Sequence, residues 1–434
     1  MNIVLLSGGS GKRLWPLSND IRSKQFIKIF KRDDGSYESM VQRIYRQIRS
    51  VDPDATVTIA TSKSQVSAIH NQLGEEVGIS VEPCRRDTFA AIALATAYLH
   101  DVKSLGEDEA VVVCPVDPFV EEGYFRCLEE MCAEAARGKE NLVLMGIEPT
   151  YPSEKYGYIK PNGTGYTFTE KPTAEKAAEY IRDGALWNGG VFAYRLKYVL
   201  GKSRELLGTA DYNELFSSYS TLRKISFDYA VVEQETSIEV LRYAGTWKDL
   251  GTWNTLTEAM EEKVIGDGIL NETCDNVHII NELGMPVLAM GLKNMVISAS
   301  PEGILVSDKE QSSYIKPFVD AIDQEIMFAE KSWGSYRVLD VEEESMTVKV
   351  TLNPGHHMNY HSHDRRDEVW TVVAGSGKTI VDGMEQLVYP GDVITMSAGC
   401  KHTIIAGDES LQLIEVQLGR EISVTDKHKY EMPV

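Results

Sequence analysis

Two stretches of the sequence combine residue types that could bind charged ligands. Near the N-terminus, Gly8, Gly9 and Gly11 follow a short apolar run, and the cations Lys12 and Arg13 come directly after them. Glycines let backbone amides approach a phosphate closely, and the two cations would add charge-assisted hydrogen bonds. An ordinary tight turn explains the same residues equally well. The stretch matches neither the P-loop pattern nor the dinucleotide-binding fingerprint.

The second stretch is rich in histidine, because five of the nine histidines fall between residues 356 and 402. His361 and His363 are two residues apart, so on a strand both side chains point to the same face, which is the inner face in a barrel. Glu368 and His402 could close the set from neighbouring strands. Three imidazoles and one carboxylate suit Zn²⁺, Fe²⁺, Mn²⁺ or Ni²⁺. The alternative is a barrel lined by histidines that binds no metal.

The elements that would position the first stretch belong to an α/β domain. Short apolar runs, typical of strands buried on both faces, alternate with helical patterns over the first 260 residues or so. This alternation predicts a mainly parallel sheet, whose ligands bind outside the carboxyl ends of its strands. The predicted strands are 3–6, 56–60, 110–114 and 142–147, and the predicted helices are 39–49, 88–100 and 121–136.

From about residue 264 the pattern changes to short strands separated by turn residues, which predicts a small β-barrel or sandwich at the C-terminus. A helix is expected only at about 314–328. We therefore expect a catalytic domain at 1–263, a β-rich linker at 264–330 and a β-domain at 331–434. The predicted strands are 276–281, 286–290, 294–298 and 303–307 in the linker, and 335–339, 346–352, 368–374, 377–381 and 412–417 beyond it.

Composition excludes several classes of protein. A length of 434 residues predicts two or three domains, and a net charge of −21 argues against a nucleic-acid partner. No apolar run is long enough for a membrane span, and residues 3–6 are too short for the core of a signal peptide. The six cysteines lack metal-type spacing, which predicts reduced thiols in the cytoplasm.

Seven motifs follow one another along the chain: GGSGKRLWPLS (8–18), EPCRRDT (82–88), YGYI (156–159), FTEKP (168–172), WNGGVF (187–192), FDYAVVE (227–233) and WKDLGTW (247–253). In this order they resemble those of sugar-1-phosphate nucleotidylyltransferases, and most closely those of mannose-1-phosphate guanylyltransferases. The resemblance implies a Rossmann-like nucleotidyltransferase domain that joins a nucleoside triphosphate, here GTP, to a sugar 1-phosphate, here mannose 1-phosphate, and releases pyrophosphate. It departs from the family at Pro118, where relatives often carry His, and at Gly189, where they carry Ser.

The chemistry of that family explains the residue types. Both substrates are anions, so the protein must align and neutralise them, with Mg²⁺ held by carboxylates. Without the resemblance, Asp117 after a strand is explained as a turn or cap residue. The resemblance implies Asp117 and Asp249 as Mg²⁺ ligands, with Arg13, Lys24 and Lys171 as further catalytic residues. It implies Gly8, Gly9, Ser10, Gly11, Lys12, Arg13, Arg86 and Asp87 as nucleotide-binding residues, and Tyr158, Glu170, Lys171, Asn188 and Gly190 as sugar-binding residues.

The C-terminal pattern resembles both cupin motifs, with Gly355, Gly375 and Gly391 spaced around the histidines, and bifunctional mannose-6-phosphate isomerase/guanylyltransferases carry such a cupin. Those isomerases typically have Gln in place of His361 and a His-Trp pair in place of Val369-Trp370. Two interpretations stay open: a cupin that isomerises mannose 6-phosphate and fructose 6-phosphate, or a metal- or sugar-binding module without turnover. A homodimer is compatible with either, since cupins commonly associate through strands.

Overall fold

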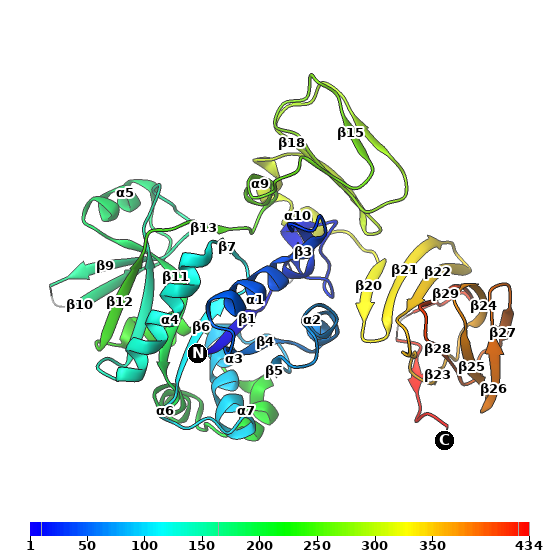
Figure 1. The fold of residues 1–434 in the computed structure, drawn as a ribbon, viewed down its shortest axis with the longest axis horizontal. Helices are drawn as coiled ribbons and strands as arrows, with labels where there is room; N and C mark the ends of the chain where they lie inside the picture. Colours follow the sequence, from blue (N-terminus) through cyan, green and yellow to red (C-terminus); the bar gives the residue numbers. More distant parts are fainter. Residues whose placement is uncertain (10, 164, 424, 434) are drawn as a thin grey trace. The chain divides into compact units, whose positions relative to one another are not determined.

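The computed structural model describes residues 1–9, 11–163, 165–423 and 425–433, which fold into two compact units (Figure 1). The first unit comprises Met1–Ser10 and Ser23–Glu261, and the second comprises Gly11–Arg22 and Glu262–Val434. The glycine-rich stretch is therefore divided between the units. None of the helices in the described ranges has the length and apolar character needed to span a bilayer.

The first unit is built on a nine-stranded sheet with the strand order β10-β9-β11-β6-β1-β4-β5, in which β8 pairs with β11 and β12. Strands β6, β1, β4 and β5 are parallel, and β11 runs antiparallel to β6. The predicted α/β fold is confirmed. The strands are β1 (Asn2–Ser7), β4 (Thr56–Ser62), β5 (Gly78–Glu82), β6 (Ala110–Pro115), β8 (Leu142–Ile147), β9 (Tyr158–Asn162), β10 (Gly165–Thr169), β11 (Leu186–Arg195) and β12 (Ile238–Tyr243).

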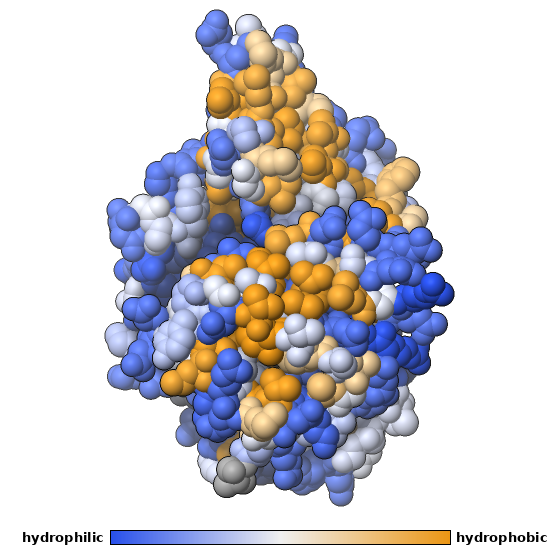
Figure 2. Space-filling view, turned by 90° about the vertical axis from the view of Figure 1, so that its right-hand side faces the viewer, coloured by the Kyte–Doolittle hydropathy of each residue, from blue (hydrophilic) through white to orange (hydrophobic). Residues whose placement is uncertain are grey.

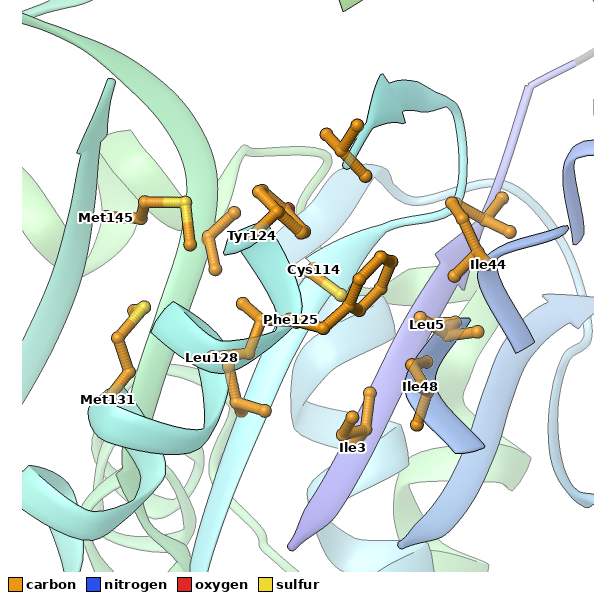
Figure 3. Close-up of a cluster of buried hydrophobic side chains, with 14 of the residues drawn as sticks. Ile3, Leu5, Ile44, Ile48, Cys114, Tyr124, Phe125, Leu128, Met131 and Met145 are labelled. Carbon is orange, nitrogen blue, oxygen red and sulfur yellow. The ribbon is translucent and has the colours of Figure 1, made fainter. Parts of the chain in front are cut away.

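Helices cover both faces of this sheet. Successive residues of the central strands point to opposite faces, so each strand contributes side chains to two hydrophobic cores. Ile3 and Leu5 of β1 belong to one hydrophobic core, and Val4 belongs to the other. Figure 3 shows the first core, in which side chains of α1 and α4 pack over β1 and β6: Ile44, Ile48, Phe125, Leu128, Ile3, Leu5 and Cys114. The helices are α1 (Met40–Val51), α2 (Val66–Leu73), α3 (Asp87–Ala97), α4 (Glu122–Arg137), α5 (Ala174–Arg182), α6 (Leu196–Leu207), α7 (Tyr212–Ser218), α8 (Phe227–Ala230) and α9 (Trp253–Glu258).

The second unit begins, after Gly11–Arg22, with a coil of short strands. Parallel pairing of β14 with β16, of β16 with β18 and of β15 with β17 stacks successive turns, and Ile279, Ala289 and Ile297 fill the interior. The expected helix at 314–328 is wrong: only α10 (Lys316–Val319) forms, because residues 320–325 are all exposed and have no face to bury. The strands are β14 (Val264–Ile265), β15 (Gly268–Leu270), β16 (His278–Asn281), β17 (Val287–Ala289), β18 (Met295–Ser300) and β19 (Gly303–Asp308).

The C-terminal part of this unit has the predicted β architecture. Its hydrogen bonds join the described strands into two separate sheets, of six and five strands, and not into one closed ring as the term barrel implies. Trp370, Leu413 and Ile404 lie in the core formed by these strands. The first sheet contains β20 (Phe328–Lys331), β21 (Gly334–Val341), β22 (Ser345–Leu352), β29 (Leu411–Leu418), β24 (Asp367–Ala374) and β27 (Val393–Met396), and the second contains β26 (Met384–Val388), β25 (Gly377–Val381), β28 (His402–Ala406), β23 (His361–Ser362) and β30 (His428–Lys429).

Candidate functional site

Two aspartates come together in the first unit beside one lysine. β7 (Pro118–Val120) pairs antiparallel with β13 (Trp247–Asp249), and this register sets Asp249 opposite Pro118, next to Asp117. The Lys24 ammonium lies 2.7 Å from an oxygen of Asp117 and 3.8 Å from an oxygen of Asp249. The two carboxylates are 36% and 45% exposed, so they can take a ligand from solution. Both residues were predicted as metal ligands, and their carboxylates share one cation here.

The glycine-rich stretch begins in the first unit, directly after β1. Gly8 and Gly9 are exposed, and a β-carbon built on either would meet no atom within 4 Å. Gly9 has a φ of 98°, a conformation that favours glycine. Its carbonyl accepts a hydrogen bond of 2.9 Å from the Ser23 hydroxyl. The backbone there is thus open to a ligand. Ser10, predicted to bind nucleotide, lies outside the described residues.

A buried polar network that the sequence analysis missed supports this loop. The Gln65 amide donates to the Ser23 hydroxyl at 2.7 Å and accepts from Thr61 at 2.7 Å. Gln25 donates to the Ser7 hydroxyl at 2.9 Å, and both glutamines are 1% exposed. Buried amides are costly unless paired, so this network fixes Ser23 against Gly9. Nothing in the sequence marked Gln25 or Gln65, although Gln25 directly follows the predicted Lys24.

The rest of the stretch belongs to the second unit. Gly11 has a φ of 62° and begins a short 3₁₀ helix over Lys12–Leu14. Lys12 forms a 3.1 Å ion pair with Asp320, while Arg13 is exposed and has no hydrogen bond or ion pair to the described residues. An arginine without a partner can take a phosphate without first breaking a contact.

A third group of predicted residues gathers around the loop before β9 and the start of β11. The Lys171 ammonium lies 2.6 Å from the Glu170 carboxylate, and this pairing raises the pKa of Lys171. Gly157 lies close beside it: a β-carbon there would be 2.7 Å from the other Glu170 oxygen, so a larger residue would make the Glu170 side chain move. The Gly157 carbonyl also accepts a hydrogen bond of 2.8 Å from the Asn188 amide. The structure thus brings together three residues expected to bind sugar phosphate: Glu170, Lys171 and Asn188.

Asp228 joins this group and was not predicted. Its carboxylate accepts a 2.6 Å hydrogen bond from the Asn188 side chain, and burial raises its pKa, with the nearby Glu170 acting in the same direction. Asn188 also accepts from the Gly190 amide at 3.0 Å, which fixes the orientation of its side chain. The motif 227–233 contained Asp228, but nothing in its spacing distinguished that aspartate from a surface residue.

Other predicted residues lie in different surroundings. Tyr158 is fully buried, and its hydroxyl donates to the Ser153 carbonyl at 3.0 Å and accepts from the Trp187 indole at 3.0 Å. It is a core residue and presents no surface to a sugar. Asp87, with a φ of 69°, begins α3 and accepts from the Thr88 amide, while Arg86 donates to the Ser220 carbonyl.

The predicted ligand set of the C-terminal domain converges in one place. Ligand atoms of His361, His363, Glu368 and His402 all lie within 4.8 Å of one another, and all four residues are buried. Glu368 approaches His363 at 3.0 Å and His402 at 3.2 Å. The strands explain this proximity, because β23 pairs His361 directly with His402.

Each histidine is oriented by a backbone carbonyl. Nδ1 of His361 faces the Asn359 carbonyl at 2.6 Å, Nδ1 of His402 faces the Cys400 carbonyl at 3.0 Å, and Nδ1 of His363 faces the Asp426 carbonyl. This leaves every Nε2 directed into the cluster, the arrangement common around metal-bound histidines. Nε2 of His402 is buried and faces the Glu368 carboxylate at 3.2 Å, so the imidazole and the carboxylate are directed at the same place.

The charge state of the cluster also fits a cation. Burial, with nearby cations acting in the same direction, lowers the pKa of His361 to about 2, so the imidazole stays neutral and its lone pair stays available. Burial alone would raise the pKa of Glu368, but hydrogen bonds from His363 and His402 outweigh it and hold this pKa well below its usual value. Arg366 donates to the same carboxylate at 3.0 Å.

A cavity of about 430 Å³ adjoins this cluster, with His361 in its wall. Its other polar walls include four cations, Lys331, Arg366, Lys427 and Lys429, together with Glu415. Burial and the nearby Glu368 raise the pKa of Glu415 to about 8, so its carboxyl group holds a proton at neutral pH. This cavity offers positive charge for an anion and a proton-carrying group beside a metal-type cluster.

Comparison with known proteins accounts for both halves of the chain. Residues 2–264 match the family described as Nucleotidyl transferase, and residues 322–431 match Mannose-6-phosphate isomerase C-terminal. The chain belongs to the nucleotidyl transferase family.

Relatives of this nucleotidyl transferase share its whole length. The xanthan biosynthesis protein XanB of Xanthomonas campestris pv. campestris (strain B100) is 30% identical, over 99% of this chain and 97% of its own. A mannose-1-phosphate guanylyltransferase of Salmonella montevideo is 28% identical over 98% and 97%. A solved structure from Thermus thermophilus, named mannose-1-phosphate geranyltransferase, has a TM-score of 0.62 at 26% identity, covering 74% of this chain and 98% of its own.

Proposed function

We propose that this enzyme transfers a guanylyl group from GTP to mannose 1-phosphate, forming GDP-mannose and pyrophosphate. The observation that carries the proposal is the pair of half-exposed carboxylates, Asp117 and Asp249, which share the Lys24 ammonium. Two acidic residues this close usually repel, and the lysine shows that the place accepts positive charge. The names of the full-length relatives supply the sugar and the base.

The reaction needs positioning more than a nucleophile from the protein. An oxygen of the sugar phosphate attacks the α-phosphorus, and pyrophosphate leaves in line. Lys171 would bind the attacking phosphate after its ion pair with Glu170 breaks. Glu170 and Asn188 would then bind sugar hydroxyls. The amides near Gly8 and Gly9, together with Lys12 and Arg13, would bind the triphosphate, and Arg86 and Asp87 would line the base pocket.

A divalent metal fits the carboxylate pair. Hard oxygen ligands with room for water suit Mg²⁺, and Asp117 and Asp249 would hold it. When bound, Mg²⁺ would neutralise phosphate charge in the transition state. Lys24 would keep both side chains oriented and stay close enough to contact the substrate phosphates.

Pyrophosphate release tests the proposal. The protein is incubated with Mg²⁺ and every pairing of four nucleoside triphosphates with several sugar 1-phosphates. We expect release with GTP and mannose 1-phosphate to exceed every other pairing. Release with another pair would change the substrates and keep the reaction, whereas no release with any pair would contradict the transferase function.

A second activity is favoured by the cavity beside the histidine cluster. We propose that the C-terminal domain isomerises mannose 6-phosphate and fructose 6-phosphate, with a transition metal held by His361, His363, Glu368 and His402. Lys427 and Lys429 would bind the substrate phosphate. Glu415 would give its proton to the sugar carbonyl oxygen and take up the proton that leaves the neighbouring carbon; the reverse transfer, to the former carbonyl carbon, would complete the isomerisation.

Interconversion of the two hexose phosphates, assayed after loading with Zn²⁺, Fe²⁺, Mn²⁺ or Ni²⁺ in turn, tests the isomerase. Glu415→Gln should lower the rate about 100-fold while the metal content stays unchanged, since general acid–base groups contribute about that much or more. The exposed Glu385→Gln is the matched control. Retention of metal with no turnover under any loading would leave a binding module, the alternative function of this domain.

We also propose that the protein forms a homodimer through the linker strands. Leu288, Met290, Ile304 and Val306 are each at least 60% exposed, and hydrophobic residues, in orange, gather in the upper part of Figure 2. Apolar surface of this extent is typical of an interface. Analytical ultracentrifugation should show a dimer that Leu288→Glu dissociates, and a monomeric wild type would contradict the proposal.

The division into a catalytic domain (1–263), linker (264–330) and cupin (331–434) is likewise proposed for the intact protein, as is a place in the cytoplasm. The six cysteines support the location, because all are free thiols. Limited proteolysis should cut near 263 and 330, and cell fractionation should recover the enzyme with other cytoplasmic proteins.

A further inference from the structure

A second cavity of the second unit, apart from the histidine cluster, has walls rich in unpaired donors. It has a volume of about 310 Å³ and is lined by Arg22, Glu282, Pro301, Phe328, Ser335, Arg337, Lys349 and Thr351. Cavities of about this size are at the lower end of the range for small-molecule sites. We propose that this cavity binds a small phosphate monoester, such as a hexose phosphate.

The strand register concentrates donors on one wall. β21 and β22 pair Arg337 directly with Lys349 and Ser335 directly with Thr351, so two cations and two hydroxyl groups face the same side of the sheet. None of these four side chains has a hydrogen bond or ion pair to the residues that the structure describes. Like charges directly opposite each other destabilise a strand pair. A bound dianion would relieve this repulsion and use all four donors.

The acidic residues nearby do not neutralise these cations. Both oxygens of Glu282 are occupied by the Arg22 guanidinium, at 2.7 and 2.8 Å. Glu330 lies opposite Ser335 in the strand register but forms no ion pair with Arg337 or Lys349. Three cations and one carboxylate therefore line the cavity, in a chain whose net charge is −21. Such a local excess of positive charge points to an anion.

The geometry favours a phosphate with an organic group attached. A guanidinium fork, an ammonium group and two hydroxyls can surround the oxygens of a tetrahedral anion. Pro301 and the ring of Phe328 add apolar surface to the cavity; Phe328 pairs with Arg337 in the register of β20 and β21, and the Arg22 guanidinium lies over its ring, 5.3 Å from the centroid. Apolar surface of this kind suits the face of a sugar ring. We therefore expect a hexose phosphate to bind more tightly than inorganic phosphate.

Footprinting of Lys349 in the full-length protein tests the proposal at the site itself. The rate at which an N-hydroxysuccinimide ester acetylates Lys349 is followed by peptide mass spectrometry, with glucose 6-phosphate, with inorganic phosphate or with chloride at matched ionic strength. We expect glucose 6-phosphate to slow acetylation of Lys349 about tenfold, which corresponds to about 90% occupancy when only free protein reacts. Inorganic phosphate should protect less at equal concentration. Lys378, which is half-buried like Lys349, serves as the internal control.

Two variants separate binding from general screening. Arg337→Gln should raise the concentration needed for half-protection about tenfold, because it removes one charge-assisted contact. Thr351→Val removes only a hydroxyl group, so it should raise the concentration needed for half-protection less. This variant serves as the test if Arg337→Gln does not fold. An unchanged Lys349 rate with glucose 6-phosphate, or equal protection by chloride, would overturn the proposal. Protection that survives both substitutions would also overturn it.

Discussion

The two ligand-type clusters of this protein are built in opposite ways. Asp117 and Asp249 are about 40% exposed and share one cation, Lys24. His361, His363, Glu368 and His402 are buried, and their imidazoles are oriented by backbone carbonyls. An open pair of carboxylates suits a hydrated ion that arrives with its substrate. A buried, pre-oriented set suits a borderline metal that stays bound between turnovers.

The largest effect that would test this difference is the loss of the open pair. Asp117→Asn and Asp249→Asn should each lower transferase turnover about 100-fold or more, because each removes charge that the metal and the phosphates require. Steady-state pyrophosphate release at saturating Mg²⁺ measures the effect. The isomerase activity and the metal content of the C-terminal domain should stay unchanged.

Asp108→Asn is the matched control for these substitutions, since Asp108 is an exposed aspartate paired with Lys197 at 2.5 Å. It should leave turnover within about twofold of the wild type, as is usual for surface changes. Near-normal turnover of both Asp117→Asn and Asp249→Asn would remove their assigned role. In that case the histidine cluster of the C-terminal domain would be the one of these two proposed metal sites that remains.

The sequence made the second cluster more predictable than the first. His361 and His363 are two residues apart, so the two-residue repeat of a strand predicts that both side chains point inward. In the structure they form one buried group with Glu368 and His402. Asp117 and Asp249 are 132 positions apart, and only the pairing of β7 with β13 brings them together. Without a resemblance to a family, no local pattern could have paired them.

Other features could not be predicted, because they depend on burial. Gln25 and Gln65 are ordinary polar residues in the sequence, and only their exclusion from water makes them supports for Ser23 and Gly9. The helix expected at 314–328 does not form, and the reason is again burial, here the lack of it. Residues 320–325 are exposed and have no surface to pack against, and Pro317 within the segment lacks a backbone N–H for an interior helix turn.

Removal of one buried ligand tests the metal site of the C-terminal domain. His363→Ala should lower the affinity for the bound transition metal about 100-fold or more, judging from the 10- to 100-fold losses caused by changes that only orient a ligand. Metal content after gel filtration, measured by plasma mass spectrometry, reports the loss. The exposed His356→Ala should keep its metal. Equal metal content in both variants would show that the cluster is not the site.

The two units should also respond differently to acid. His278, at the beginning of β16, accepts a hydrogen bond from the buried Lys309 at 2.8 Å, and its pKa is lowered to about 4 by burial and then by the charge of Lys309. The unfolded chain has the ordinary value of about 6.5, so between pH 6.5 and about 4 the unfolded state binds more protons. The stability of the linker strands should therefore decrease as the pH is lowered through that window. Above the window this group should not affect their stability.

The expected slope is up to about 1.4 kcal/mol per pH unit for this one group. Hydrogen exchange of the β16 and β18 amides, corrected for intrinsic rates, measures it within the intact protein. His278→Gln should flatten the slope, and the exposed His356→Gln should not. An equal slope in all three proteins would assign the acid sensitivity to other groups.

The smallest expected effect separates a core role from a binding role for Tyr158. Its hydroxyl is buried and pairs with both Ser153 and the Trp187 indole at 3.0 Å. Tyr158→Phe should lower the free energy of unfolding by about 1–3 kcal/mol, because the indole and the Ser153 groups would stay buried without their partner. It should leave the KM for the sugar phosphate unchanged, since a fully buried ring contacts no substrate. Tyr314→Phe, at a position that is 70% exposed, should change neither quantity. A raised KM without loss of stability would instead place Tyr158 among the sugar-binding residues, together with Glu170 and Asn188.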